Sequence, residues 1–122
     1  MVRVIPATAE LLERAMGEPL QRSTKAIALV RAKDGEVVGC AGIFPEDNRL
    51  VIFSKLTDEA RACPRAIITG YRRLLELADQ SPLPLHALPD PDVPLAERFL
   101  EHMGFRQIAE TCWERQPQRR TA

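Results

Sequence analysis

The sequence predicts a mixed α/β (α+β) fold, a mostly antiparallel sheet with helices on both faces. In the N-terminal half, alternating apolar segments flank turn signals, which indicates antiparallel hairpins. From Pro64 to Ala78 the apolar residues recur at helical spacing, and a short apolar strand follows. A helix between two strands is typical of a crossover within one sheet, so hairpins and crossover together predict a mixed sheet.

The N-terminal half is expected to form four strands and one helix. Thr8 is a typical helix cap and Gly17 a typical helix end, whereas Lys33–Gly35 and Pro45–Asn48 are turn signals. Glu18–Lys25 is expected to be a polar loop. The expected elements are a strand at Met1–Ile5, a helix at Ala9–Met16, and strands at Ala26–Arg31, Glu36–Phe44 and Arg49–Phe53.

The C-terminal half is expected to form two helices and three short strands. Pro64 suits the first position of a helix, because its missing N–H has no partner there. Gly70 is expected to let this helix approach the sheet closely, and Tyr71 lies on its apolar face. The expected elements are helices at Pro64–Ala78 and Leu95–Met103, and strands at Leu85–Leu88, Phe105–Ala109 and Thr111–Arg115.

Five prolines between Pro82 and Pro94 surround the expected strand Leu85–Leu88. Proline cannot donate to a strand ladder, so we expect this strand to be unpaired at its ends on at least one side. Such a gap in a mixed sheet is a candidate cleft. Phe105 follows the helix-ending Gly104 and is expected to pack between the main helix and the sheet.

Composition limits the classes of function. The chain has 122 residues, enough for one domain, expected at 1–115 with a frayed tail at 116–122. Seventeen basic and seventeen acidic residues give no net charge, which argues against a nucleic-acid partner. No run is long and apolar enough for a membrane span or a signal peptide. The three cysteines lack disulfide or zinc spacing, so we expect no metal and a cytoplasmic location.

Two segments resemble motifs of the GNAT superfamily of acyl-CoA-dependent N-acyltransferases. Leu56–Ala66 (LTDEARACPRA) follows the family pattern V-h-P-x-x-[RQ]-G-x-G-x-[GA], matching it at Arg61 and Ala66. Val93–Phe105 follows the pattern N-x-x-A-x-x-x-Y-x-x-x-G-F and matches it at three positions: Ala96, Gly104 and Phe105. Together with the element order, the resemblance covers nearly the whole chain and implies a GNAT-like fold. Comparable short chains are encoded by phages and prophages, which suggests such an origin.

The resemblance implies acetyl-CoA as cosubstrate, with its pyrophosphate on backbone amides at the start of the main helix. The pantetheine arm would lie where the strand before that helix diverges from the strand after it, the latter contributing His86 to Asp90. The residues expected to contact acetyl-CoA are Phe53, Ser54, Leu56, Arg61, Ala62, Cys63, Arg65 and Ala66.

The sequence departs from the family at the positions that carry its chemistry. Ala62 and Pro64 replace two glycines of the phosphate-binding segment, and Pro64 removes one N–H donor. Val93 and Leu100 stand where the family has asparagine and the tyrosine that often protonates the leaving thiolate. No catalytic residue is assigned from the sequence.

Other polar residues have a structural interpretation beside a functional one. His86 is expected to be a packed or half-exposed strand residue rather than a base. His102 lies in the last turn of its expected helix, where a cation interacts favourably with the negative end of the helix dipole. A structural role is therefore expected for it. Asp90 and Asp92 either orient an amine or simply form a turn before the helix.

The function expected from this resemblance is acetyl transfer from acetyl-CoA to an unidentified small-molecule or protein amine. The alternative is a GNAT-fold protein that has lost catalysis and binds a partner, for example in phage assembly. An unrelated α+β binding domain is a third interpretation. A homodimer remains open, and no nucleic-acid or membrane partner is expected.

Overall fold

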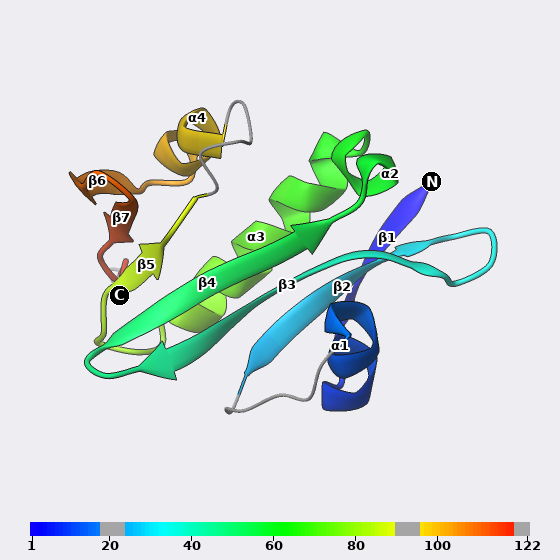
Figure 1. Cartoon of the computed structure of the whole chain (residues 1–122), viewed down its shortest axis with the longest axis horizontal. Coiled ribbons are helices and arrows are strands. Elements are labelled where there is room, and N and C mark those ends of the chain that lie inside the picture. The colour runs from blue at the N-terminus through cyan, green and yellow to red at the C-terminus, as the bar shows by residue number, and fades with distance from the viewer. Residues whose placement is uncertain (18–23, 90–95, 119–122) are drawn as a thin grey trace.

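A computed structural model describes residues 1–17, 24–89 and 96–118, which form one seven-stranded sheet with helices on both faces (Figure 1). The elements in chain order are β1 Val2–Pro6, α1 Ala9–Met16, β2 Lys25–Arg31, β3 Val37–Glu46, β4 Arg49–Leu56, α2 Asp58–Arg61, α3 Pro64–Ala78, β5 Leu85–Ala87, α4 Ala96–His102, β6 Arg106–Ala109 and β7 Cys112–Arg115. The predicted fold class is therefore confirmed.

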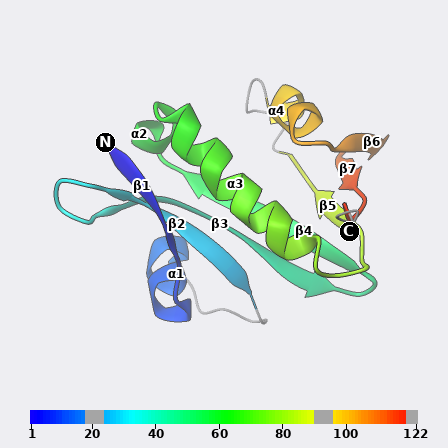
Figure 2. The same ribbon diagram turned by 180° about the vertical axis from the view of Figure 1, so that it is seen from behind.

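The strand order is β1-β2-β3-β4-β5-β7-β6. Every neighbouring pair is antiparallel except β4 and β5, which are parallel. This pair is parallel because α3 returns the chain across the sheet between the two strands. In Figures 1 and 2, α4 and β5 lie on one side of α3, whereas β1 and β2 lie on the other.

The main core lies between the sheet and the face of α3 and α4. Leu74 of α3 is fully buried there, together with Leu85 of β5 and Leu100 of α4. A Cβ added to Gly70 would lie 2.8 Å from Cδ1 of Ile27, which confirms the expected close approach of α3 to the sheet. Phe105 belongs to the same core, as predicted.

Helix α1 covers part of the opposite face of the sheet. Thr8 caps it by accepting a hydrogen bond from the Leu11 amide, and Gly17 ends it in the left-handed conformation, both as predicted. The Cys40 thiol lies 3.7 Å from the Met16 sulfur, and burial raises the pKa of that thiol.

Several boundaries differ from the predicted ones. The strand β3 continues through Pro45 and Glu46, so the turn contains only Asp47 and Asn48, with Asp47 at φ 55°. Proline is tolerated here because the pairing ends one residue later. Similarly, β1 includes Pro6, the last residue of that strand.

The strand that precedes α3 also departs from prediction. The strand β4 extends to Leu56 rather than ending at Phe53, because β3 pairs with it as far as Leu56. The short helix α2 was not predicted. Thr57 begins it by accepting a hydrogen bond from the Ala60 amide. A threonine followed by Asp58 and Glu59 is a helix-start signal that the sequence does contain.

Candidate active site at the open edge of β4

The strands β4 and β5 pair over only three residues. The register joins Leu50–Ile52 to Leu85–Ala87, and the chain beyond Ala87 no longer follows β4. The residues Phe53–Leu56 therefore keep β3 on one side, and no strand of the described residues pairs with them on the other. We call this segment the open edge of β4. Of the expected strand Leu85–Leu88, the residues Leu85–Ala87 pair with both β4 and β7, whereas its end at Leu88 is unpaired among the described residues.

The side chains of the open edge alternate between the two faces of the sheet. Leu56 packs toward α2 and α3, next to the buried Ala60. Phe53 points to the opposite face, where its ring lies over Gly42, 2.8 Å from where a Cβ would stand. The Phe53 and Phe44 rings have centroids 5.9 Å apart on that face. The edge therefore offers a helix-covered side and a partly aromatic side.

The turn from β4 to α3 is fixed by Thr57 and Ala60. The Thr57 hydroxyl donates to the Val38 carbonyl at 2.6 Å, and its backbone amide donates to the same oxygen at 3.1 Å. Ala60 is fully buried against Leu29 and Val38. Helix α2 is thereby attached to β3, which positions the start of α3.

A surface ion pair attaches α2 to the hairpin of β2 and β3. Arg31 donates to both carboxylate oxygens of Glu59, at 2.8 and 2.7 Å, and to Asp34 at 2.7 Å. The Glu59 hydrogen bond is the main cause that raises the pKa of Arg31. The same bond lowers the pKa of Glu59, and the pKa of Asp34 is lowered chiefly by the backbone amide of Glu36.

The backbone amides at the start of α3 are mostly occupied. The amides of Ala62, Cys63 and Ala66 donate to the carbonyls of Asp58, Ala60 and Cys63, at 3.1, 2.9 and 3.1 Å. Pro64 has no N–H. Of the backbone amides at 62–66 that were expected to bind the pyrophosphate, only the Arg65 amide has no acceptor within the described part of the chain.

The guanidinium groups beside this helix start are available. Arg61 and Arg65 are both exposed, and neither forms an ion pair within residues 1–17, 24–89 and 96–118. Cys63, between them, is a half-buried free thiol. Two side-chain cations and one backbone amide are therefore without a partner among the described residues at this helix start.

A half-buried phenol lies between α3 and α4. Tyr71 extends from α3, and its ring meets Phe99 of α4 edge-on, with centroids 4.8 Å apart. Burial raises the pKa of Tyr71, and the side chain of Ser54 on β4 opposes that rise. The sequence placed Tyr71 on the apolar face of α3 but gave no sign of its contact with Phe99.

The structure also shows the surroundings of other residues that the sequence singled out. Leu100 is buried in the main core, so the position of the family's tyrosine carries no polar group. His102 is exposed at the end of α4. Asp90, Asp92 and Val93 lie outside the described residues.

His86 belongs to a part-buried polar network on the face opposite α3. Arg49 donates to Nδ1 of His86 at 3.1 Å, so Nε2 carries the proton and donates to Glu114 at 2.9 Å. Glu114 also accepts from Gln116, and Arg49 from β4 also donates to Glu46. Both ring nitrogens of His86 are thus engaged, as expected of a packed strand residue.

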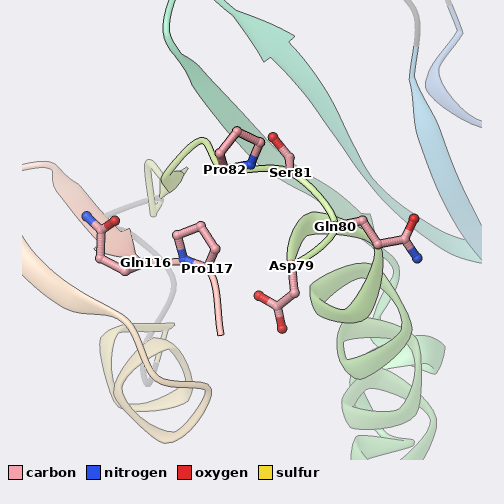
Figure 3. A pocket seen from close by; sticks show the side chains of 6 residues that line it. All are labelled: Asp79, Gln80, Ser81, Pro82, Gln116 and Pro117. Carbon is pink, nitrogen blue, oxygen red and sulfur yellow. The ribbon is translucent and has the colours of Figure 1, made fainter. Parts of the chain in front are cut away.

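A hollow lies at the other end of α3, away from the helix start. It has a volume of about 450 Å³ and lies between the C-terminal end of α3 and the segment after β7 (Figure 3). Asp79 lines it, but its carboxylate accepts from Arg115 at 2.6 Å and from the Gln118 amide at 3.0 Å. These bonds attach the end of the sheet to α3.

Among the described residues, none of the helices is both long enough and apolar enough to span a membrane. No group of three or more histidine, cysteine, aspartate or glutamate residues is arranged there to hold a metal ion.

At the level of sequence, no family model and no curated protein matches the chain. At the level of structure, similar chains exist. A GNAT-family acetyltransferase from Staphylococcus aureus Mu50 superposes with a TM-score of 0.70 at 9% identity, over 97% of this chain and 100% of that one. Mutant forms of the spermidine/spermine N-acetyltransferase SpeG from Vibrio cholerae give 0.66 at 10% identity, over 95% and 93%. A cAMP-binding acyltransferase from Mycobacterium smegmatis gives 0.61 at 15% identity, over 97% of this chain and 43% of that one. The chain therefore has the fold of GNAT-family acetyltransferases.

Proposed function

We propose that the protein is an N-acetyltransferase that moves an acetyl group from acetyl-CoA to an amine. The observation that carries this proposal is the open edge of β4, which leads directly into the start of α3. An unpaired strand edge offers backbone donors and acceptors to an extended, amide-containing arm. The positive end of the helix dipole, together with Arg61 and Arg65, would attract the phosphate groups at the other end of acetyl-CoA.

The proposed contacts follow the chain from the open edge to α3. The arm would lie along Phe53, Ser54 and Leu56. The pyrophosphate would lie at the segment 61–66, where Arg61 and Arg65 would supply positive charge. The backbone of Ala62, Cys63 and Ala66 would line the pyrophosphate position. Because three of these amides are already bonded internally, the cations carry more of the binding here than the amides do.

The acceptor amine would approach from the face of Phe53 and Lys55. The opposite face is covered by α2 and α3, against which Leu56 packs. The amine nitrogen attacks the thioester carbonyl, the C–N bond forms and the C–S bond breaks. A neutral amine is required, because a protonated nitrogen has no lone pair to donate.

Calorimetric titration with CoA and acetyl-CoA tests the proposal. We expect dissociation constants in the micromolar range and release of free thiol when an acceptor amine is added. The amine panel should include spermidine, the substrate class named for the Vibrio cholerae neighbour. No detectable binding at millimolar CoA to folded protein would overturn the enzyme proposal and leave the fold unaffected.

The second candidate is a GNAT-fold protein without catalysis that binds or assembles with a partner, for example one of phage origin. The occupied amides of Ala62, Cys63 and Ala66 favour it, as does the apolar Leu100. Under this proposal CoA does not bind at all, so the same titration separates the two functions.

We further propose a cytoplasmic location, because Cys40, Cys63 and Cys112 are all free thiols. A homodimer stays part of the proposal, and light scattering at micromolar concentration measures it directly.

A further inference from the structure

We propose that the acceptor is a free amino acid with an apolar side chain, so that a carboxylate lies beside the amino group that is acetylated. The inference rests on the proposed function and adds the chemistry of the acceptor. It comes from the face of the open edge that carries Phe53 and Lys55, from which the amine would approach.

Apolar surface is available on the acceptor side where β4 and β5 diverge. Phe53 and Leu88 directly follow the last paired residues of the two strands. Leu88 is 54% exposed, and the half-buried ring of Phe53 has its centroid 5.9 Å from that of Phe44. A molecule bound at this point would therefore meet aromatic and aliphatic carbon, which favours an acceptor with an apolar part.

An exposed cation lies on the same face of the sheet. Side chains alternate along a strand, so Lys55 and Phe53 point to the same side. The ammonium group of Lys55 forms no ion pair within residues 1–17, 24–89 and 96–118. Lys55 stands opposite Cys40 of β3, whose thiol meets Met16 of α1. The cation is therefore on the face that α1 partly covers, at the end of the open edge.

The carboxylates of the described strands do not balance this cation. Glu46 and Glu114 are the acidic residues of those strands. Glu46 accepts from Arg49 at 2.8 Å, and Glu114 accepts from His86 at 2.9 Å. A polycationic amine would thus be repelled by Lys55 and would find both strand carboxylates already bound. An acceptor that carries a carboxylate would be attracted instead, and such complementarity determines specificity.

Lys55 also favours the reactive form of the amine. A nearby positive charge disfavours protonation of an amino group, and the neutral amine is the form that attacks the thioester. The C–N bond forms, the C–S bond breaks, and the departing thiolate takes the proton that the nitrogen loses. With its carboxylate at Lys55 and its side chain at Phe53, an amino acid would hold its amino group between the two, next to the open edge.

Steady-state acetylation of leucine, leucinamide, glycine and spermidine tests this acceptor class, with release of the CoA thiol as the readout. We expect kcat/KM for leucine to exceed that for glycine by about tenfold, because of the apolar contact, and to exceed that for spermidine by more. Leucinamide has the same side chain and amino group as leucine but lacks the carboxylate.

The Lys55→Met variant removes the charge and keeps most of the apolar stem. Because leucine and leucinamide differ in basicity, the decisive quantity is the ratio of their kcat/KM values. We expect this ratio to fall about tenfold in the variant, through a higher KM for leucine, as for loss of a charge-assisted contact. Lys33→Met, at an exposed position in the turn between β2 and β3, is the control and should leave the ratio unchanged.

CoA binding is measured by calorimetry on the same samples, so that two kinds of failure are distinguished. If the protein binds CoA but acetylates glycine or spermidine as well as leucine, or none of the four amines, this acceptor class is wrong and the CoA site stands. An unchanged ratio in Lys55→Met overturns the role of Lys55. Failure of the folded, unmodified protein to bind CoA would overturn the proposed function itself, and this inference with it.

Discussion

Arg31 on β2 and Glu59 on α2 form a two-point ion pair, although 28 residues separate them in the sequence. The pair joins the first hairpin to the turn that leads into α3. Because both side chains are at the surface, the solvent screens the attraction and the pair adds little to the free energy of unfolding. Its consequence is the position of the helix start rather than global stability.

Glu59→Gln tests whether this pair positions the proposed phosphate site. We expect a small decrease in melting temperature and a several-fold weaker binding of CoA by calorimetry. The direction of the change in CoA affinity is informative, because removing a negative charge near a bound pyrophosphate would by itself strengthen CoA binding. Glu76→Gln, at an exposed position of α3, is the control for charge alone. Tighter CoA binding by Glu59→Gln would mean that the pair does not organise the site.

Phe105→Ala tests the junction between α4 and β6. Phe105 is 5% exposed and belongs to the main core. We expect the substitution to cost about 3–5 kcal/mol in urea unfolding, as for a buried aromatic residue. Ile108→Ala, at a 46% exposed position three residues later, should cost within about 0.5 kcal/mol. A loss below about 1 kcal/mol for Phe105→Ala would contradict its place in the core.

The order of the elements was predictable because it depends on local signals. The helical spacing of Pro64–Ala78 and the caps Thr8 and Gly17 gave elements that the structure confirms at the same residues. The extension of β4 to Leu56 was not predictable in this way. It depends on pairing with β3, which overrides the local preferences of the exposed segment Ser54–Lys55.

The candidate site was predictable in its segments but not in its contacts. A pattern places the residues 61–66 at a helix start, yet it does not reveal that Thr57 and Glu59 attach that start to neighbouring strands. The contact of Tyr71 with Phe99 also joins two elements, α3 and α4. Helical periodicity assigned Tyr71 to an apolar face and could not show where its hydroxyl ends.

Trp113→Phe tests an unpaired group in the core. Trp113 is 4% exposed, and its indole N–H has no hydrogen-bond partner in the part of the chain that the structure describes. A buried donor without a partner costs about 1–3 kcal/mol, and phenylalanine removes that cost while losing some packing. We therefore expect a net change within about 1 kcal/mol, measured by circular dichroism because the chain has one tryptophan. Trp113→Ala is the comparison and should cost about 3–5 kcal/mol. If Trp113→Phe costs as much, the N–H is satisfied in solution.

Glu114→Gln tests the pH dependence of stability. The hydrogen bond with His86 is the main cause that lowers the pKa of Glu114. The stabilising effect of this bond on the folded protein is therefore complete above the ordinary glutamate pKa of about 4.3. That effect is lost as the pH falls through the lowered value in the folded protein. We expect the melting temperature of the variant to fall less steeply with pH from about 5 to 3. Glu110→Gln, in an exposed turn, should leave the slope unchanged; an unchanged slope for Glu114→Gln would contradict the shift.

Pro64→Gly tests whether the start of α3 faces a phosphate group. The substitution restores one N–H donor and removes the proline ring, and a hydrogen bond to a charged acceptor contributes about 1.5–3 kcal/mol. Glycine also raises the conformational entropy of the unfolded chain, which lowers stability by about 0.4–1 kcal/mol. We therefore expect opposite signs: CoA affinity rises about tenfold or more while the melting temperature falls slightly.

Arg61→Ala belongs to the same experiment, because Arg61 supplies charge at that position without shaping the backbone. We expect it to weaken CoA binding with no loss of stability, since its guanidinium has no partner within the described residues. Lower stability of Pro64→Gly with CoA binding still undetectable would mean that this helix start does not face a phosphate. The binding protein without catalysis would then be the better account of the occupied amides at Ala62, Cys63 and Ala66.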